Sequence, residues 1–257
     1  MSVPEPPVFE HLREELRAGL PSGRQVCAQA IAAQLGSHAE DTAWIKRHFS
    51  ELVESIQIAA YETYLAAERP AAINALRKVF GPMLPEPRRA EDLFVLLEDN
   101  FVSVDKLFLG LTQGRRARAG KAFEELITVL FDKLRYPYTP QPIINGQPDF
   151  LLPSVERFRE NPLDCIIFTA KRTLRERWRQ IVTEGLRGYM FFLATIDEGI
   201  SDGDLAEILH HRIYLVTPER IRSTRYPTHS NVISFETFFD QHLDPAMARW
   251  RANGIIE

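Results

Sequence analysis

The sequence predicts an α/β protein in which a helical N-terminal region precedes a mixed sheet flanked by helices. Residues 8–80 carry apolar side chains at helical spacing, interrupted by short turn-forming stretches. Beyond residue 135 the pattern changes to short apolar runs of the length of buried strands, at 149–152, 165–170, 190–195 and 212–216. Helical patterns at 172–189 and 202–211 separate the later runs, which is typical of an α/β core.

The helical elements follow from their breaks. In the N-terminal region we expect breaks at PSG, LGSH, ERP and GPMLPEP, which are residues 21–23, 35–38, 68–70 and 81–87. The longest helical pattern there is WIKRHFSELVESIQIAAYETYLAAE, at 44–68. A further helix is expected from about 115 to 135, and the tail at 235–254 predicts a final helix or pair of helices.

The bulk composition is that of an ordinary globular protein. The 257 residues are 45% hydrophobic and 26% charged, and the net charge of −4 does not by itself indicate a nucleic-acid partner. We expect a single domain over residues 1–257, with 1–100 as a helical N-terminal region and 101–257 as the core.

Cysteine usage and apolar run length predict a cytoplasmic protein. Cys27 and Cys165 lie far apart, and Cys165 begins the apolar run CIIFTA, so buried free thiols are favoured over a disulfide or a metal site. The N-terminus has no apolar segment of the kind found in signal peptides, and no run approaches membrane-spanning length.

An acid and a lysine flank two of the predicted strands. Asp149 follows Pro148 at the head of the first apolar run, where a buried carboxylate is costly unless a partner such as a divalent cation accompanies it. Lys171 lies just past the run that ends at Ala170. The alternatives are a turn residue for Asp149 and a solvated side chain for Lys171.

The helical pattern that follows Lys171 adds a second carboxylate. At 100° per residue, one face collects the apolar side chains Leu174, Trp178, Ile181, Val182 and Tyr189. Glu184 and Arg177 fall along one flank of that face, with Glu184 thirteen residues after Lys171. Glu184 is therefore expected at the margin of the core, where it can point toward the strand ends.

The helix predicted at 115–135 supplies a third candidate. Glu124 borders its apolar stripe, whereas Glu125 points away from it; the stripe consists of Phe123, Leu126, Ile127, Leu130, Phe131 and Leu134. Three carboxylates at the edge of a core, with one lysine, can surround one or two Mg²⁺ ions that act on a phosphodiester.

Two basic runs lie beside these carboxylates. RRARAGK contains Arg115, Arg116, Arg118 and Lys121, and KRTLRERWR contains Lys171, Arg172, Arg175, Arg177 and Arg179. Such runs are often solvated faces. Their position next to candidate metal ligands favours a nucleic-acid backbone, with Arg115, Arg116, Arg118, Lys121 and Arg172 as contacts.

Residues from about 113 to 227 resemble the catalytic domain of type II restriction endonucleases of the EcoRII C-terminal, PspGI and SsoII group, in the PD-(D/E)xK superfamily. The matching pieces occur in the same order and are RARAGKAFE at 116–124, PDFLLPS at 148–154, AKRTLRERWRQIVTE at 170–184 and DEGIS at 197–201. The resemblance implies a restriction-endonuclease-like core with a central mixed sheet flanked by helices. It also implies a Mg²⁺-dependent site-specific deoxyribonuclease that leaves 5′-phosphates.

The resemblance also implies roles for the candidate residues. In this group the lysine strand lacks its usual acid, and a glutamate from the next helix replaces it in space; here these are Thr169 and Glu184. Asp149 and Glu184 would then bind Mg²⁺, Lys171 would orient or activate water, and Glu124 would complete the acidic cluster as a second-site or outer ligand.

The tripeptide RER at 175–177 resembles the base-reading element of the group. Arginine reads guanine through bidentate bonds, and glutamate accepts from cytosine, so Arg175, Glu176 and Arg177 suit G·C pairs. The group implies a CC…GG site of the CCWGG or CCNGG kind, a homodimer matched to that pseudo-palindrome, and a cognate DNA methyltransferase in the same restriction-modification system.

Members of the group flip central nucleotides out of the duplex, which requires an aromatic platform. Tyr61, with Gln57 one turn before it, is the candidate, and Tyr64 and Trp44 are rivals. The alternative is that each aromatic belongs to the core. Two other functions stay open: a nicking or repair nuclease on the same fold, and a DNA-binding module derived from it.

Overall fold

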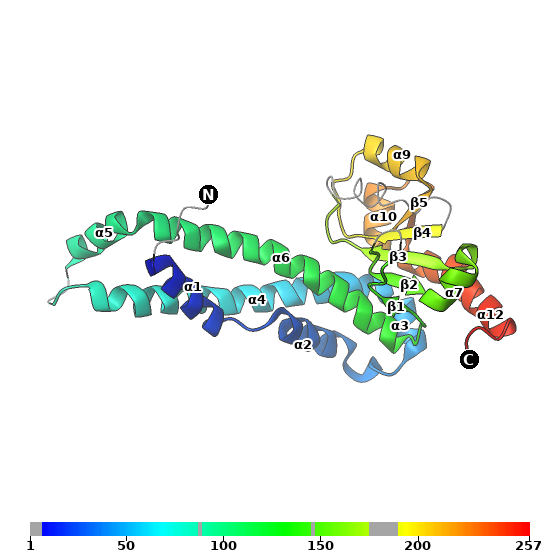
Figure 1. The fold of residues 1–257 in the computed structure, drawn as a ribbon, viewed down its shortest axis with the longest axis horizontal. Helices are drawn as coiled ribbons and strands as arrows, with labels where there is room; N and C mark the ends of the chain where they lie inside the picture. Colours follow the sequence, from blue (N-terminus) through cyan, green and yellow to red (C-terminus); the bar gives the residue numbers. More distant parts are fainter. Residues whose placement is uncertain (1–6, 87–88, 145–146, 175–189) are drawn as a thin grey trace.

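The computed structural model describes residues 7–86, 89–144, 147–174 and 190–257, and it shows a long helical arm joined to a sheet at one end (Figure 1). The arm contains α1 (Pro7–Gly19), α2 (Gly23–Leu35), α4 (Phe49–Phe80), α5 (Ala90–Asp99) and α6 (Phe101–Lys133). The short α3 (Thr42–Arg47) lies at the sheet end of the arm. None of the described helices is long and apolar enough to cross a membrane.

The predicted break at PSG is confirmed by the cap of α2. Ser22 has extended backbone angles, and its hydroxyl accepts a hydrogen bond from the Gln25 N–H. The Gln25 side chain accepts in return from the Ser22 N–H, which makes a capping box. Serine is therefore the residue that starts this helix.

The predicted break at ERP is wrong, because α4 continues through Pro70 to Phe80. A proline inside a helix removes one backbone hydrogen bond and costs about 3 kcal/mol. Packing on both sides offsets that cost, since the turns after Pro70 are buried against α1 and α6 in a cluster made of Leu12, Leu16, Ala71, Ala72, Ala75, Phe80, Leu107 and Leu111.

Helix α6 begins at Phe101, earlier than the predicted start near 115, and it links the arm to the sheet. Its first half packs in the arm through Leu107 and Leu111. Its second half packs on the sheet through the predicted stripe, in which Phe123, Leu126, Ile127, Leu130 and Phe131 are fully buried. The predicted boundary near residue 100 coincides with the junction of α5 and α6 and stays a prediction.

The sheet is mixed, and in the described ranges its six strands lie in sequence order. They are β1 (Thr139–Pro140), β2 (Phe150–Leu152), β3 (Ile166–Ala170), β4 (Met190–Ala194), β5 (Ile213–Thr217) and β6 (Val232–Ser234). Strands β1 to β3 are antiparallel and β3 to β6 are parallel. The four predicted apolar runs are β2 to β5, whereas the short β1 and β6 gave no sequence signal.

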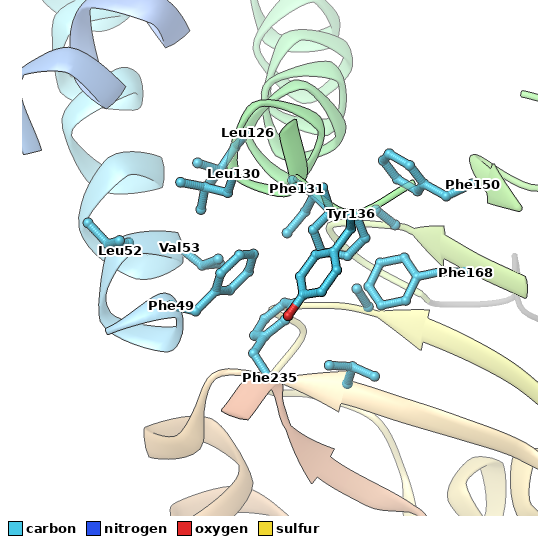
Figure 2. Close-up of a cluster of buried hydrophobic side chains, with 14 of the residues drawn as sticks. Phe49, Leu52, Val53, Leu126, Leu130, Phe131, Tyr136, Phe150, Phe168 and Phe235 are labelled. Atoms are coloured by element: carbon cyan, nitrogen blue, oxygen red, sulfur yellow. The ribbon is translucent and has the colours of Figure 1, made fainter. Parts of the chain in front are cut away.

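Helices cover both faces of the sheet. An aromatic cluster lies where α4, α6 and one face of the sheet meet, with Phe131 at 5.3 Å from Phe150 and 5.2 Å from Phe168 between ring centroids (Figure 2). Because alternate strand residues face opposite sides, Leu151 and Ile167 belong to the other face, which packs with α9 (Asp202–His210) and α10 (Glu219–Arg225). Helices packed on both faces hold the sheet in place, and with it the residues at the ends of its strands.

The remaining described helices are α7 (Val155–Glu160), α11 (Phe235–Phe238) and α12 (Asp244–Ala252), with a π-helical turn between the last two. The tail is thus a pair of helices, one of the two predicted arrangements. Both cysteines are buried free thiols, as predicted, and burial raises the pKa of each to about 11.

Candidate active site and the pocket beside it

Asp149 lies at the start of β2 and points across to the end of β3. The antiparallel register pairs Phe150 with Phe168, which places Asp149 opposite Thr169. The Thr169 hydroxyl donates to Asp149 Oδ2 at 2.6 Å, and the Ala170 N–H donates to the same oxygen at 2.7 Å. Lys171 Nζ lies 2.9 Å from Oδ2 and 3.2 Å from Oδ1.

These contacts explain how a carboxylate is buried here. Asp149 is only 6% exposed, and an unpaired charge at such a position would be costly. Two hydrogen bonds and the Lys171 ammonium satisfy Oδ2. Among the described residues Oδ1 contacts only Lys171, so it keeps lone pairs for a further partner. Asp149 is therefore a buried and paired carboxylate rather than a solvated acid.

The oxygen donors suit a hard divalent cation such as Mg²⁺. Asp149 Oδ1 is directed away from the Thr169 and Ala170 donors and can accept a cation. Among the described residues no three His, Cys, Asp or Glu side chains gather into a metal-binding cluster. The predicted cluster also needs Glu184, which lies outside the described residues.

Glu124 is connected to this site through Gln141. Gln141 Nε2 donates to Glu124 Oε1 at 3.0 Å, and the Gln141 N–H donates to the Asp149 carbonyl at 2.9 Å. Gln141 has a φ of 44°, a left-handed conformation that costs a non-glycine residue about 1–2 kcal/mol. The sequence did not indicate Gln141, because no hydrophobic periodicity or motif marks a glutamine that follows a two-residue strand.

Glu125 behaves differently from its neighbour. Its carboxylate lies 3.5 Å from Arg24 Nε on α2, on a different side of α6, and its side chain is 39% exposed. The two glutamates are both half-buried and have different partners, and the assignment of Glu124 as the site carboxylate stays a prediction.

The segment that follows Lys171 is held by the end of β4. The Lys171 N–H donates to the Ala194 carbonyl at 2.9 Å, and the Thr195 hydroxyl donates to the Arg172 carbonyl at 3.2 Å. Asp197, the first residue of DEGIS, accepts from the Leu174 N–H at 2.9 Å. The predicted residues Arg175, Glu176, Arg177 and Glu184 follow this anchored start and lie outside the described residues.

A pocket lies beside this segment, and four elements line it. The lining comes from α2, α4, α6 and the loop after β3, and includes Gly23, Val26, Gln57, Tyr61, Tyr64, Arg115, Arg118 and Arg172. The candidate base pocket and part of the predicted backbone contacts therefore meet in one place.

The predicted basic residues divide into two kinds. Arg115 pairs with the carboxylate of Glu68, which is 3% exposed, through its Nε at 2.7 Å and through its Nη2. Arg118 donates to the Tyr64 hydroxyl and stacks 4.7 Å from the centroid of its ring. Arg116 and Lys121 are exposed on α6. The first two build the pocket wall, and the second two are free to face a ligand outside it.

The structure separates the three candidate aromatics. Tyr61 is 45% exposed and lines the pocket with Gln57. Tyr64 is 5% exposed, and burial raises the pKa of its hydroxyl to about 12, so it stays protonated at neutral pH. Trp44 stacks between His38 and His48 at 4.2 and 4.5 Å between centroids, and the pocket lining does not include it. Tyr61 is therefore the most exposed of the three, and it lines the pocket.

Comparison with known proteins identifies the family. Residues 88–239, more than half of the chain, match the family model described as EcoRII C terminal. The chain belongs to the EcoRII C-terminal family. The match spans Asp149, Lys171 and the adjoining loop, whereas the pocket residues on α2 and α4 precede it.

Two curated relatives agree with the EcoRII C-terminal assignment. The chain is 28% identical over 152 residues to the type II restriction enzyme SsoII from Shigella sonnei, covering 54% of this chain and 49% of that protein. It is 32% identical over 180 residues to the type II restriction enzyme EcoRII from Escherichia coli, covering 61% and 44%. The chain therefore spans about half the length of these two relatives.

Solved structures confirm the predicted restriction-endonuclease-like fold. Metal-depleted Ecl18kI in complex with uncleaved, modified DNA has a TM-score of 0.83 at 21% identity, covering 97% of this chain and 86% of that one. The PspGI–substrate DNA complex has a TM-score of 0.62 at 21% identity, covering 89% and 94%. Both likenesses extend well beyond the family match and into the helical arm.

Proposed function

We propose that this protein is a Mg²⁺-dependent type II restriction endonuclease of the cytoplasm that cleaves double-stranded DNA at a CC…GG-type pseudo-palindrome. The observation that carries the proposal is the buried Asp149–Lys171 pair at the ends of β2 and β3, in a chain of a family whose curated relatives are type II restriction enzymes. The products are 5′-phosphates, and the substrate class is supported by the DNA complexes of Ecl18kI and PspGI.

The residues divide the chemistry among themselves. A bound Mg²⁺ supplies charge stabilisation at the phosphodiester and lowers the pKa of attacking water. Asp149 offers Oδ1 to that ion, while Thr169 and Ala170 hold Oδ2. Lys171 is placed to orient the attacking water and to balance negative charge. Glu184 is proposed as the second carboxylate and Glu124 as an outer ligand reached through Gln141.

The direct test is incubation of a plasmid with the protein, with and without Mg²⁺. Discrete fragments that appear only with the metal ion support the proposal, and sequencing of the fragment ends gives the recognition site and the cleavage position. Nicked circles without linear product would favour the nicking or repair nuclease. Uncut but retarded DNA would favour a DNA-binding module.

We also propose that the pocket beside the active site takes the central nucleotide after it leaves the duplex. Tyr61 offers a half-exposed ring for stacking, and Gln57 lies one helical turn before it with an amide that can read a base edge. The arginines that line the pocket favour a nucleotide over an apolar ligand.

The Thr169 hydroxyl gives a sharp prediction about the position that normally carries an acid. Thr169→Val keeps the shape but removes the donor to Asp149 Oδ2, and hydrogen bonds to charged groups contribute about 1.5–3 kcal/mol. We expect cleavage to slow by roughly 10–100-fold, with Thr169→Ser retaining most of the rate. Single-turnover rates across Mg²⁺ concentrations check this, and equal rates for the valine and serine variants would contradict it.

Arg175 and Arg177 are proposed to read guanines of the site. Replacing either by alanine should weaken binding to the cognate site by about 1–3 kcal/mol, the scale of one bidentate guanine contact. Competition binding against a site with one G·C pair exchanged measures the effect. An equal loss on all sequences would instead make these residues phosphate contacts.

A symmetric dimer is proposed as the acting form, because a two-fold protein matches a pseudo-palindrome. The far end of the arm supports a contact between two copies. Helix α5 has no buried residue, and Phe94, Phe101 and Phe108 are 67%, 68% and 54% exposed near the junction of α5 and α6 (Figure 1). Large apolar side chains exposed close together mark surfaces that contact other proteins.

Two substitutions test this contact. The double variant Phe94→Glu, Phe101→Glu should raise the dimer dissociation constant by about 100-fold or more, because central aromatic residues contribute about 2 kcal/mol or more each. Leu163→Glu, at a 73% exposed position outside the arm, is the matched control. Sedimentation velocity measures the outcome, and a wild-type chain that is monomeric with and without DNA would contradict the proposal.

A further inference from the structure

The pocket beside the active site contains two buried donors that lack an acceptor among the described residues. Gln57 is 8% exposed and its Nε2 has no hydrogen-bond partner there, and Arg172 Nε is also buried without one. A buried unsatisfied donor costs about 1–3 kcal/mol. Two of them lining one pocket indicate that the protein tolerates this cost for a ligand that brings the acceptors.

The other cations of the pocket have partners inside the protein. Arg115 is held by the buried carboxylate of Glu68, and Arg118 is held by the hydroxyl and the ring of Tyr64. These two arginines therefore shape the wall. Arg172 belongs to the loop after β3, and its Nε has no acceptor among the described residues.

Arg172 also directly follows Lys171. The backbone of this pair is held at the end of β4, by the bond from the Lys171 N–H to Ala194 and by the bond that the Arg172 carbonyl accepts from Thr195. From this common support the Lys171 side chain reaches Asp149, while the Arg172 side chain lines the pocket. A single dipeptide thus joins the reacting centre to the pocket.

We propose that Arg172 binds the extrahelical nucleotide in this pocket and thereby positions Lys171 for the reaction, an inference that rests on the proposed function. The ligand is a nucleobase edge with carbonyl or ring-nitrogen acceptors, which satisfy the donors of Arg172 and Gln57. Arg172 acts as a positioning residue. A misplacement of about 1 Å can cost 10²-fold in rate. Cleavage is therefore slow when the pocket is empty and fast only when the central nucleotide of the recognition site occupies it.

The test crosses an enzyme change with a DNA change, once fragment ends have given the cognate site. Wild type and Arg172→Gln are each measured in single turnover on cognate DNA and on the same DNA with an abasic central nucleotide. We expect each change alone to slow cleavage by about 10–100-fold, and both together to slow it no further. Arg172→Lys, which keeps one donor and the charge, should recover part of the rate on cognate DNA.

Arg116→Gln is the matched control, because Arg116 is an exposed arginine on α6 that does not line the pocket. We expect Arg116→Gln to weaken the salt-dependent affinity for DNA. Its effect on the cleavage rate should be independent of the abasic centre, so that the two fold-changes multiply. The inference fails if the Arg172→Gln and abasic effects also multiply, if the wild type is insensitive to the abasic centre, or if Arg172→Gln weakens all DNA binding with a smaller salt slope. A wild type that cuts no DNA would instead overturn the proposed function.

Discussion

Asp149→Ala and Lys171→Ala are each expected to abolish DNA cleavage while leaving specific DNA binding within a few-fold of wild type. In the proposed site Asp149 is the buried carboxylate that would bind the metal ion, and Lys171 is the ammonium that contacts both of its oxygens. Proton transfer and water activation at such a site contribute about 10²–10⁴-fold or more. Neither side chain is proposed to contact a base, so we expect the cleavage rate to fall and the DNA affinity to stay nearly unchanged.

The measurement separates chemistry from binding. Single-turnover cleavage with Mg²⁺ should fall by at least about 10³-fold for either variant, whereas retardation of cognate DNA in EDTA should persist. Asp149→Asn is a useful companion, because it keeps the shape and the hydrogen bond from Thr169 while removing the charge. Near-normal turnover by any of the three variants would show that Asp149 and Lys171 do not carry out the reaction.

A change in fold would confuse that result, so stability has to be followed as well. In Asp149→Ala the Thr169 hydroxyl, 3% exposed, loses its acceptor, which costs about 1–3 kcal/mol. Lys171 has a side chain that is 31% exposed and can turn to water when its partner is gone. Lys171→Ala instead leaves the buried Asp149 carboxylate without its cation, which costs about 3–5 kcal/mol. We therefore expect the lower melting temperature for Lys171→Ala, with both variants folded at the temperature of the assay.

The sequence predicts the core of this site because strand ends leave a clear signal. A polar side chain interrupts each apolar run, so Asp149 marks the position just before β2 and Lys171 the position just after β3. The period of α6 separates Glu124 from Glu125 in the same way, since only one of two adjacent helix residues can border the stripe.

Other parts of the structure depend on tertiary contacts that a single sequence does not reveal. Helix α4 passes through Pro70 because α1 and α6 bury the turns that follow it. Gln141 joins Glu124 to the backbone at Asp149 across the fold. Arg172 is predicted as a backbone contact from its place in a basic run, whereas the structure places it in the lining of the pocket.

The resemblance to the restriction endonuclease group contributes what periodicity alone does not. It explains why Thr169 stands where an acid is usual, and the structure shows that this hydroxyl bonds directly to Asp149 at 2.6 Å. A hydroxyl donor at that position supports the existing carboxylate and leaves the second one to come from elsewhere in the chain. The natural source is the segment whose start is anchored by Asp197 at Leu174.

Glu184→Ala is accordingly expected to be as inactive as Asp149→Ala, whereas Glu125→Ala should be nearly neutral. Glu184 lies thirteen residues after Lys171, and the sequence pattern at 172–189 predicts it at the border of the apolar face, in a position to point toward the strand ends. Without Glu184, Asp149 would be the one carboxylate proposed as a direct ligand of the ion. Mg²⁺ is usually bound through one or two carboxylates, so it should still bind, but more weakly. Raising the Mg²⁺ concentration should then restore part of the activity of Glu184→Ala.

Glu125 is the matched control because it is a glutamate of the same region that meets a different partner. Its pair with Arg24 is largely exposed, and such pairs contribute about 0–1 kcal/mol. Cleavage rates across a Mg²⁺ titration distinguish the two variants, with a shifted metal requirement expected for Glu184→Ala alone. Finding the shift in Glu125→Ala and none in Glu184→Ala would mean that the second carboxylate comes from α6, on the face that contacts α2.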